Sequence, residues 1–185
     1  LRALYRSAGA WESLVTLLTQ TEGEPAKVEH LREAADICLK KLGSRERAIP
    51  ILEALVEQAP TDRAARMALA DALRATGALE PARAILGKLL DEYGRRKPPE
   101  RAEVHTQLAR IASAADDAAE ARRQLETAIA MNPEHPGALR MLGGVYRDAG
   151  ELERAERMFG ALLLIALRRP QGDGAPDGPA RSEAM

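Results

Sequence analysis

A residue that can end a helix recurs along the chain at a nearly constant interval. It is glycine at four places and aspartate at one, and the positions are Gly9, Gly43, Gly77, Asp116 and Gly150. The steps between them are 34, 34, 39 and 34 residues. The long step contains Lys97-Pro98-Pro99-Glu100-Arg101, which predicts a five-residue insertion over 97–101 in a surface loop. A fixed interval of this length is typical of an array of similar units that pack against their neighbours.

Two further sets of residues keep the same steps. A small residue recurs as alanine, and a large apolar residue stands four positions after it. The alanines are Ala48, Ala82, Ala121 and Ala155, and the large residues are Leu18, Leu52, Leu86, Leu125 and Phe159. On both sides of each turn residue, apolar residues recur three and four apart, so each unit is predicted to be a pair of helices. The small residues let two helices approach closely, and the large ones fill the space between successive pairs.

The last unit, 136–169, carries the most complete version of this pattern. Its first helix contains Leu139-x2-Leu142-Gly143-x2-Tyr146, and its second contains Ala155-x3-Phe159. This motif resembles the tetratricopeptide repeat, with Leu139 where the family usually has tryptophan. The resemblance implies an all-α fold, a right-handed superhelical solenoid of antiparallel helix pairs over 1–169. The predicted repeats are about 1–27 (incomplete), 28–62, 63–96, 102–135 and 136–169.

Three stretches depart from the regular pattern. Cys38 lies five residues before Gly43, whereas Tyr146 lies four before Gly150, so we predict one extra residue near the end of the helix over about 26–42. Pro50 falls inside the following helix, which is therefore expected to start late or to bend. Residues 170–185 are rich in proline and glycine and are expected to form a flexible tail.

The composition and motifs argue against catalysis. His30, His105 and His135 have no histidine or cysteine at metal-ligand spacing, and Cys38 reads as a small buried hydrophobe. The sequence contains neither a glycine-rich loop after a strand nor a nucleophile motif. We therefore expect no enzymatic activity, no cofactor and no metal.

Charge and hydropathy limit the partners. The formal net charge is −1 and the pI is about 6.4, which argues against nucleic-acid binding; Arg95-Arg96-Lys97 reads as a solvated helix end. No apolar run approaches the roughly 18 residues of a membrane span. Arginine supplies most of the 27 basic residues, which favours a GC-rich bacterial source. Because Leu1 falls inside a predicted helix, we expect a piece of a larger protein, whose compartment, cytoplasmic or periplasmic, stays open.

The resemblance also indicates where a partner would bind. In this family the first helices line the concave face, and partners lie along it. Four of the five residues that stand three positions before a turn residue are basic; the five are Arg6, Lys40, Arg74, Ser113 and Arg147. Arg110 and Arg140 are expected to point the same way. We call these six cations the basic ladder and predict that it binds an extended segment of a partner protein, for which an acidic sequence would suit the charges.

Other interpretations remain open. The cations also suit the last turn of a helix, where they complement the helix dipole, and nearby carboxylates dilute their charge. The chaperone-binding carboxylate clamp of this family requires asparagine on a first helix. The only asparagine here, Asn132, lies in a turn, so we expect no such clamp. A different function would be self-association, such as a homodimer, or a spacer role, acting through the apolar ends of the solenoid. The candidate residues for this are Phe159, Leu162, Leu163 and Ile165.

Overall fold

The computed structural model describes residues 1–20, 26–94 and 98–168. This part of the chain contains ten helices and no strand. The helices are α1 (Arg2–Ser7), α2 (Trp11–Thr19), α3 (Val28–Lys40), α4 (Arg45–Gln58), α5 (Arg63–Ala75), α6 (Leu79–Tyr93), α7 (Arg101–Ala114), α8 (Ala118–Met131), α9 (Pro136–Asp148) and α10 (Leu152–Arg168). The predicted all-α fold is confirmed. The predicted tail and the Arg95-Arg96-Lys97 cluster lie outside the described residues, and Arg101, which was assigned to the insertion, begins α7.

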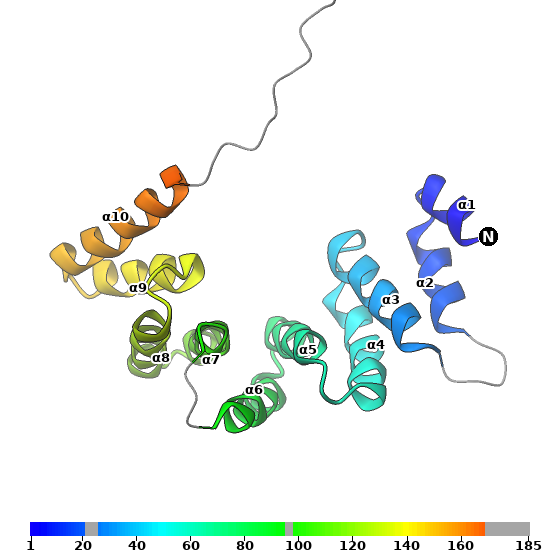
Figure 1. Ribbon diagram of the computed structural model, residues 1–185, viewed down its shortest axis with the longest axis horizontal. Helices are drawn as coiled ribbons and strands as arrows, with labels where there is room; N and C mark the ends of the chain where they lie inside the picture. The colour runs from blue at the N-terminus through cyan, green and yellow to red at the C-terminus, as the bar shows by residue number, and fades with distance from the viewer. Residues whose placement is uncertain (21–25, 95–97, 169–185) are drawn as a thin grey trace, which may run out of the picture.

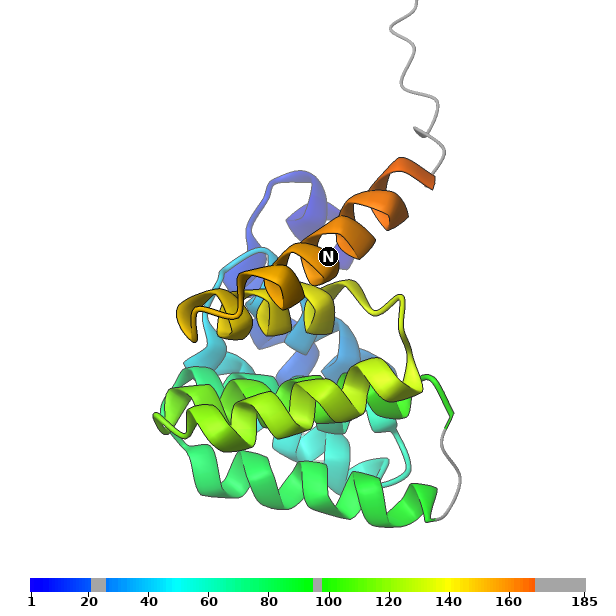
Figure 2. The same ribbon diagram turned by 90° about the vertical axis from the view of Figure 1, so that its left-hand side faces the viewer.

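The helices stack in chain order into an open arc (Figure 1). The principal contacts join consecutive helices, and α7 also touches both α5 and α9. The helices α3, α5 and α7 lie toward the inner side of the arc, whereas α4, α6 and α8 form its outer side (Figure 1). Seen from the side, α10 crosses α9 at an angle and extends past it (Figure 2). This arrangement is the predicted solenoid of helix pairs.

The turn residues explain how the chain reverses within each pair. Gly9, Gly43, Gly77 and Gly150 all have positive φ, and so does Asp116 at 57°. In the left-handed region glycine has no steric cost, and aspartate tolerates it better than most residues. Five positions identified from their spacing therefore share one backbone conformation.

The hydrogen bonds of these turns locate the extra residue in the second repeat. After Gly77 the N–H of Ala78 donates to the carbonyl of Leu73, five residues back, and the turns at Gly9, Asp116 and Gly150 have the same bond. After Gly43 the N–H of Ser44 donates to the carbonyl of Cys38, six residues back. The prediction of one additional residue at the end of α3 is confirmed.

Pro50 does not delay the start of α4. The helix begins at Arg45, capped by the Ser44 hydroxyl, which accepts from the N–H of Arg47. Pro50 therefore lies inside the helix, so the late start, one of the two alternatives expected from this proline, does not occur. The Pro50 side chain is exposed. The helix bond that proline cannot donate is consequently lost on the solvent side, where water can replace it.

The core is built from the recurring apolar residues. The large side chains Leu18, Leu52, Leu86 and Leu125 are almost completely buried, whereas Phe159 in the last repeat is 37% exposed. Cys38 is fully buried, and burial raises the pKa of its thiol, as expected for a small core residue. Within the described ranges, no helix is both long and apolar enough to cross a bilayer.

Candidate functional site

Each of the five first helices supplies a cation to the basic ladder, and α9 supplies two, Arg140 and Arg147. Arg6 lies on α1, Lys40 on α3, Arg74 on α5, Arg110 on α7 and Arg147 on α9. Their side chains are between about one quarter and two thirds exposed: Arg74 is the most covered at 23% and Lys40 the most open at 69%. The ladder is thus present at the surface.

Each of these five cations contacts a carboxylate of the same chain. Arg6 donates to Glu33 at 3.0 Å, Lys40 to Asp36 at 2.9 Å, Arg74 to Asp71 at 2.8 Å and Arg147 to Asp148 at 2.9 Å, while Arg110 lies 4.0 Å from Asp71. Dilution of the positive charge by nearby carboxylates was expected from the sequence, and the carboxylates that make these contacts are Glu33, Asp36, Asp71 and Asp148. The ladder is therefore a row of ion pairs rather than a continuous positive stripe.

Arg140 is placed apart from the other ladder cations. It is exposed, and it lines a groove of about 490 Å³ together with the predicted self-association residues Phe159, Leu162, Leu163 and Ile165. No ion pair to Arg140 occurs among the described residues. The structure thus groups Arg140 with the last helix, and the sequence pattern gave no sign of this.

The first two repeats form a second groove of about 490 Å³, which the sequence analysis did not identify. Trp11 and Ile37 provide its apolar surface, and the Lys41 ammonium lies 5.4 Å from the centre of the Trp11 ring. Charged residues surround this surface. They are Arg6, Glu29, Arg32, Glu33, Asp36, Lys40 and Lys41, so two ladder cations belong to this groove. We call it the Trp11 groove.

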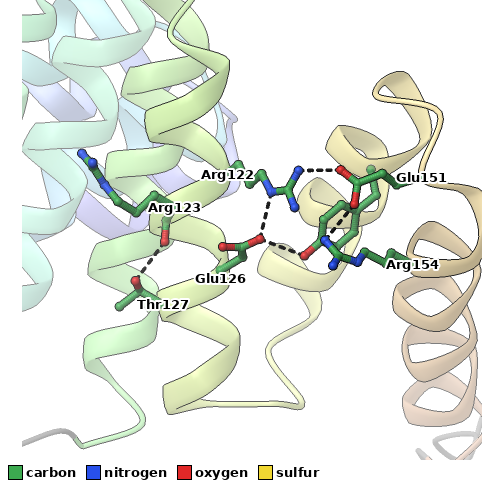
Figure 3. Close-up of polar contacts among 7 residues, drawn as sticks. Arg122, Arg123, Glu126, Thr127, Glu151 and Arg154 are labelled. Atoms are coloured by element: carbon green, nitrogen blue, oxygen red, sulfur yellow. Dashed lines mark hydrogen bonds and ion pairs between the residues drawn. The ribbon is translucent and has the colours of Figure 1, made fainter.

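A polar network joins the last two repeats (Figure 3). Arg122 on α8 donates to Glu126 at 2.9 Å and also to Glu151, while Arg154 on α10 donates to Glu151 at 2.8 Å. The hydroxyl of Tyr146 on α9 donates to Glu126 at 3.0 Å. Because the partners come from three helices, the network fixes how the fourth and fifth repeats meet.

The ionisation of this network follows from its contacts. The hydrogen bond from Arg122 holds the pKa of Glu126 below its usual value. Burial, together with the bond to Glu126, raises the pKa of the Tyr146 hydroxyl. The guanidiniums of Arg122 and Arg154 lie 5.0 Å and 5.6 Å from the centre of the Tyr146 ring. At neutral pH Glu126 is therefore charged and the Tyr146 phenol is protonated, which is the state that makes the bond between them.

A comparison with protein families establishes what kind of chain this is. A model described as "Tetratricopeptide repeat" matches residues 39–111 and 112–174, well over half of the chain. The chain belongs to the tetratricopeptide repeat family. The tetratricopeptide repeat fold is that of a protein–protein interaction scaffold, and proteins of the family are generally not enzymes.

Solved structures share this tetratricopeptide repeat fold. A crystal structure of MamA is 19% identical with a TM-score of 0.66, covering 90% of this chain and 95% of that chain. MamA from Desulfovibrio magneticus RS-1 is 15% identical with a TM-score of 0.67, covering 91% and 92%. A putative kinesin light chain with nearly identical TPR-like repeats, from Podosopora anserina, is 24% identical with a TM-score of 0.61, covering 91% and 94%. These likenesses establish the fold alone. No curated protein sequence matches significantly.

His105 and His135 make contacts within the tetratricopeptide repeat solenoid. His105 is buried, its Nδ1 lies 2.7 Å from Gln124 Oε1, and burial lowers its pKa. His135 caps α9 by accepting the N–H of Ala138, and its Nε2 lies 2.8 Å from Glu103. Across the described residues, no three His, Cys, Asp or Glu side chains are placed to hold a metal ion.

Proposed function

We propose that this chain is a non-enzymatic scaffold whose concave face binds an extended segment of a partner protein. The observation that supports this most directly is the Trp11 groove, a concavity in which the ladder cations Arg6 and Lys40 stand beside an apolar surface. Recognition sites for peptides combine such features, because an apolar side chain supplies affinity and charged groups fix its register.

The distribution of charge over the helices favours an acidic segment. The first helices α3, α5, α7 and α9 carry nine cations and six carboxylates. The second helices α4, α6 and α8 carry six cations and eight carboxylates. Although the net charge of the chain is −1, these first helices together carry more cations than carboxylates, whereas the second helices carry fewer; α3 alone among the four has one carboxylate in excess. Such a contrast steers an acidic partner to the inner side.

The carboxylates of the Trp11 groove restrict which partner segments can bind well. Glu33 and Asp36 hold Arg6 and Lys40, so a purely acidic ligand competes with two internal partners. A segment that also places an apolar side chain on Trp11 and Ile37 gains the burial of that side chain. We therefore propose that the partner segment has an apolar residue flanked by acidic ones.

A peptide-display selection followed by fluorescence anisotropy tests this proposal. Peptides selected from a random library on the wild-type protein are measured against the double variant Arg6→Glu/Lys40→Glu. We expect their affinity to fall at least about tenfold, which corresponds to about 1.4 kcal/mol. The matched control is Arg83→Glu/Lys88→Glu on the outer helix α6, which makes the same change in net charge and should bind like the wild type. Equal binding by both double variants would show that the concave face is not the site.

The position of exposed apolar residues favours self-association as a second candidate function. In the described part of the chain, every exposed large hydrophobic residue lies in the first or last helix or next to it. These residues are Leu1, Leu4, Leu152, Phe159, Leu163, Leu164 and Leu167. Exposed apolar residues gathered at each end of the solenoid are typical of surfaces that meet another protein, here a second copy of the chain.

Sedimentation velocity over a range of concentrations tests this candidate. If the groove that Arg140 lines with Phe159, Leu162, Leu163 and Ile165 joins two copies, the wild type should associate. Leu163→Glu should then sediment as a monomer, because the introduced charge would have to be buried. Leu152→Glu, at the other end of α10 and also exposed, is the matched control and should associate like the wild type. A wild type that is monomeric at every concentration would exclude self-association.

A further inference from the structure

We propose that Arg74 and Arg110 form a binding site for an acidic side chain of the partner segment, and that Asp71 occupies this site in the free protein. This inference rests on the proposed function, because it names one contact of the segment on the concave face. We call these three residues the Asp71 cluster.

The geometry of the Asp71 cluster differs from that of the other ladder pairs. Arg74 donates to Asp71 Oδ1 at 2.8 Å, and the guanidinium of Arg110 lies 4.0 Å from the same oxygen. Arg6, Lys40 and Arg147 each have a carboxylate of their own. Asp71 alone among the ladder carboxylates is shared by two cations, so the cluster keeps one uncompensated positive charge.

The location of the cluster suits a ligand that runs along the solenoid. Arg74 and Arg110 come from α5 and α7, which are in contact and lie on the inner side of the arc (Figure 1). The side chains of Arg110 and Asp71 are 37% and 31% exposed. A carboxylate arriving from the inner side can therefore reach guanidiniums of two successive repeats at once.

The guanidinium group favours a carboxylate as the ligand. Its N–H donors form a planar fork that matches a carboxylate, and charge-assisted bonds of this kind are the strong ones. At 4.0 Å, Arg110 is attracted to Asp71 but makes no hydrogen bond with it. The donors of Arg110 are thus available, and an incoming carboxylate would compete with Asp71 for Arg74. Asp71 acts as an internal competitor that lowers the affinity for the partner.

An NMR titration tests the inference. The probe is a dodecapeptide of alternating glutamate and glycine, and its control is the same peptide with glutamine in place of glutamate. The readouts are the arginine Nε–Hε resonances, assigned by single substitution, and the dissociation constant. We expect the signals of Arg74 and Arg110 to move with the glutamate peptide alone. Arg110→Gln should weaken binding about tenfold, the usual effect of losing one hydrogen bond to a charged group.

The variant Asp71→Asn distinguishes two possible roles of Asp71, competition with the ligand and support of the Arg74 side chain. If Asp71 competes with the ligand, Asp71→Asn should tighten binding by roughly threefold, the scale of a partly exposed ion pair. If Asp71 only holds Arg74 in place, the same variant would weaken binding and overturn the inference. The matched controls are Glu80→Gln and Arg83→Gln. Each breaks an ion pair on the outer helix α6 whose two residues are also three positions apart in the sequence, with 3.9 Å between their charged atoms, and each should leave binding unchanged.

The outcomes separate this inference from the proposed function. A glutamate peptide that shifts residues of the Trp11 groove but not Arg74 and Arg110 would refute the Asp71 cluster and leave the concave face as the binding surface. A peptide that shifts no residue of the inner helices would refute both.

Discussion

Replacing Leu125 with alanine should lower the free energy of unfolding by about 2–5 kcal/mol, the range for a leucine deleted from a well-packed core. Leu125 is fully buried on α8 and packs within the apolar cluster that includes Ala109 of α7 and Leu142 of α9. Its removal would leave a cavity between two successive repeats. Because repeats stabilise each other through their interfaces, the loss should extend to both neighbours.

The matched comparison is Phe159→Ala, at the equivalent position of the last repeat. Phe159 is 37% exposed and has no helix on its outer side among the described residues. We therefore expect its replacement to cost only about 1–2 kcal/mol, less than a buried phenylalanine usually would. Urea unfolding followed by circular dichroism at 222 nm measures both values. A Phe159→Ala loss as large as that of Leu125→Ala would mean that the outer face of α10 is covered in solution.

Two adjacent glycines of α9 should respond to alanine with opposite signs. A Cβ at Gly143 would lie 2.7 Å from Cε1 of Phe159, closer than real side chains allow, whereas a Cβ at Gly144 would meet nothing within 4 Å. Gly143→Ala should thus destabilise the protein by about 1–2 kcal/mol through overpacking. Gly144→Ala should stabilise it by about 0.5–1 kcal/mol, because alanine loses less conformational entropy in a helix.

A double variant identifies the cause of the first effect. The ring of Phe159 is the group that Gly143→Ala would push aside, so in a Phe159→Ala background the same substitution should lose its penalty. The two changes would then be non-additive by about 1–2 kcal/mol, within the range for residues in contact. Additive effects in urea unfolding would show that the ring is not what excludes a side chain at position 143.

Most of the fold could be predicted from the sequence because the repeats share one local geometry. The recurrence of Gly43 and Gly77 identified turns, and even the aspartate at 116 has the same positive φ. The shift of Cys38 by one residue revealed the lengthened end of α3, which its hydrogen bond to Ser44 confirms. The sequence could not decide whether Pro50 delays the start of α4 or bends it, because the exposed side of a helix tolerates proline and exposure is a tertiary property.

The candidate site was less predictable because its contacts cross between repeats. The pair of Asp36 and Lys40 is visible as an i, i+4 spacing on one helix. The bond from Arg6 to Glu33 and the approach of Arg110 to Asp71 join different repeats, and they depend on how much each repeat is rotated relative to the previous one. The sequence period fixes which residues are equivalent, but it does not fix that rotation. The placement of Arg140 beside α10 is a contact within one repeat, and it depends on the angle at which α10 crosses α9, which the sequence period does not fix either.

The sequential contacts of the helices also determine how the molecule would respond to a stretching force. Its principal contacts join each helix to the next, so tension applied along the solenoid loads the interfaces one after another rather than all together. A unit of 34 residues drawn out to an extended strand spans roughly 110 Å. Such a solenoid yields by releasing one helix pair while its neighbours stay folded. We therefore expect the molecule to lengthen under load by one helix pair at a time.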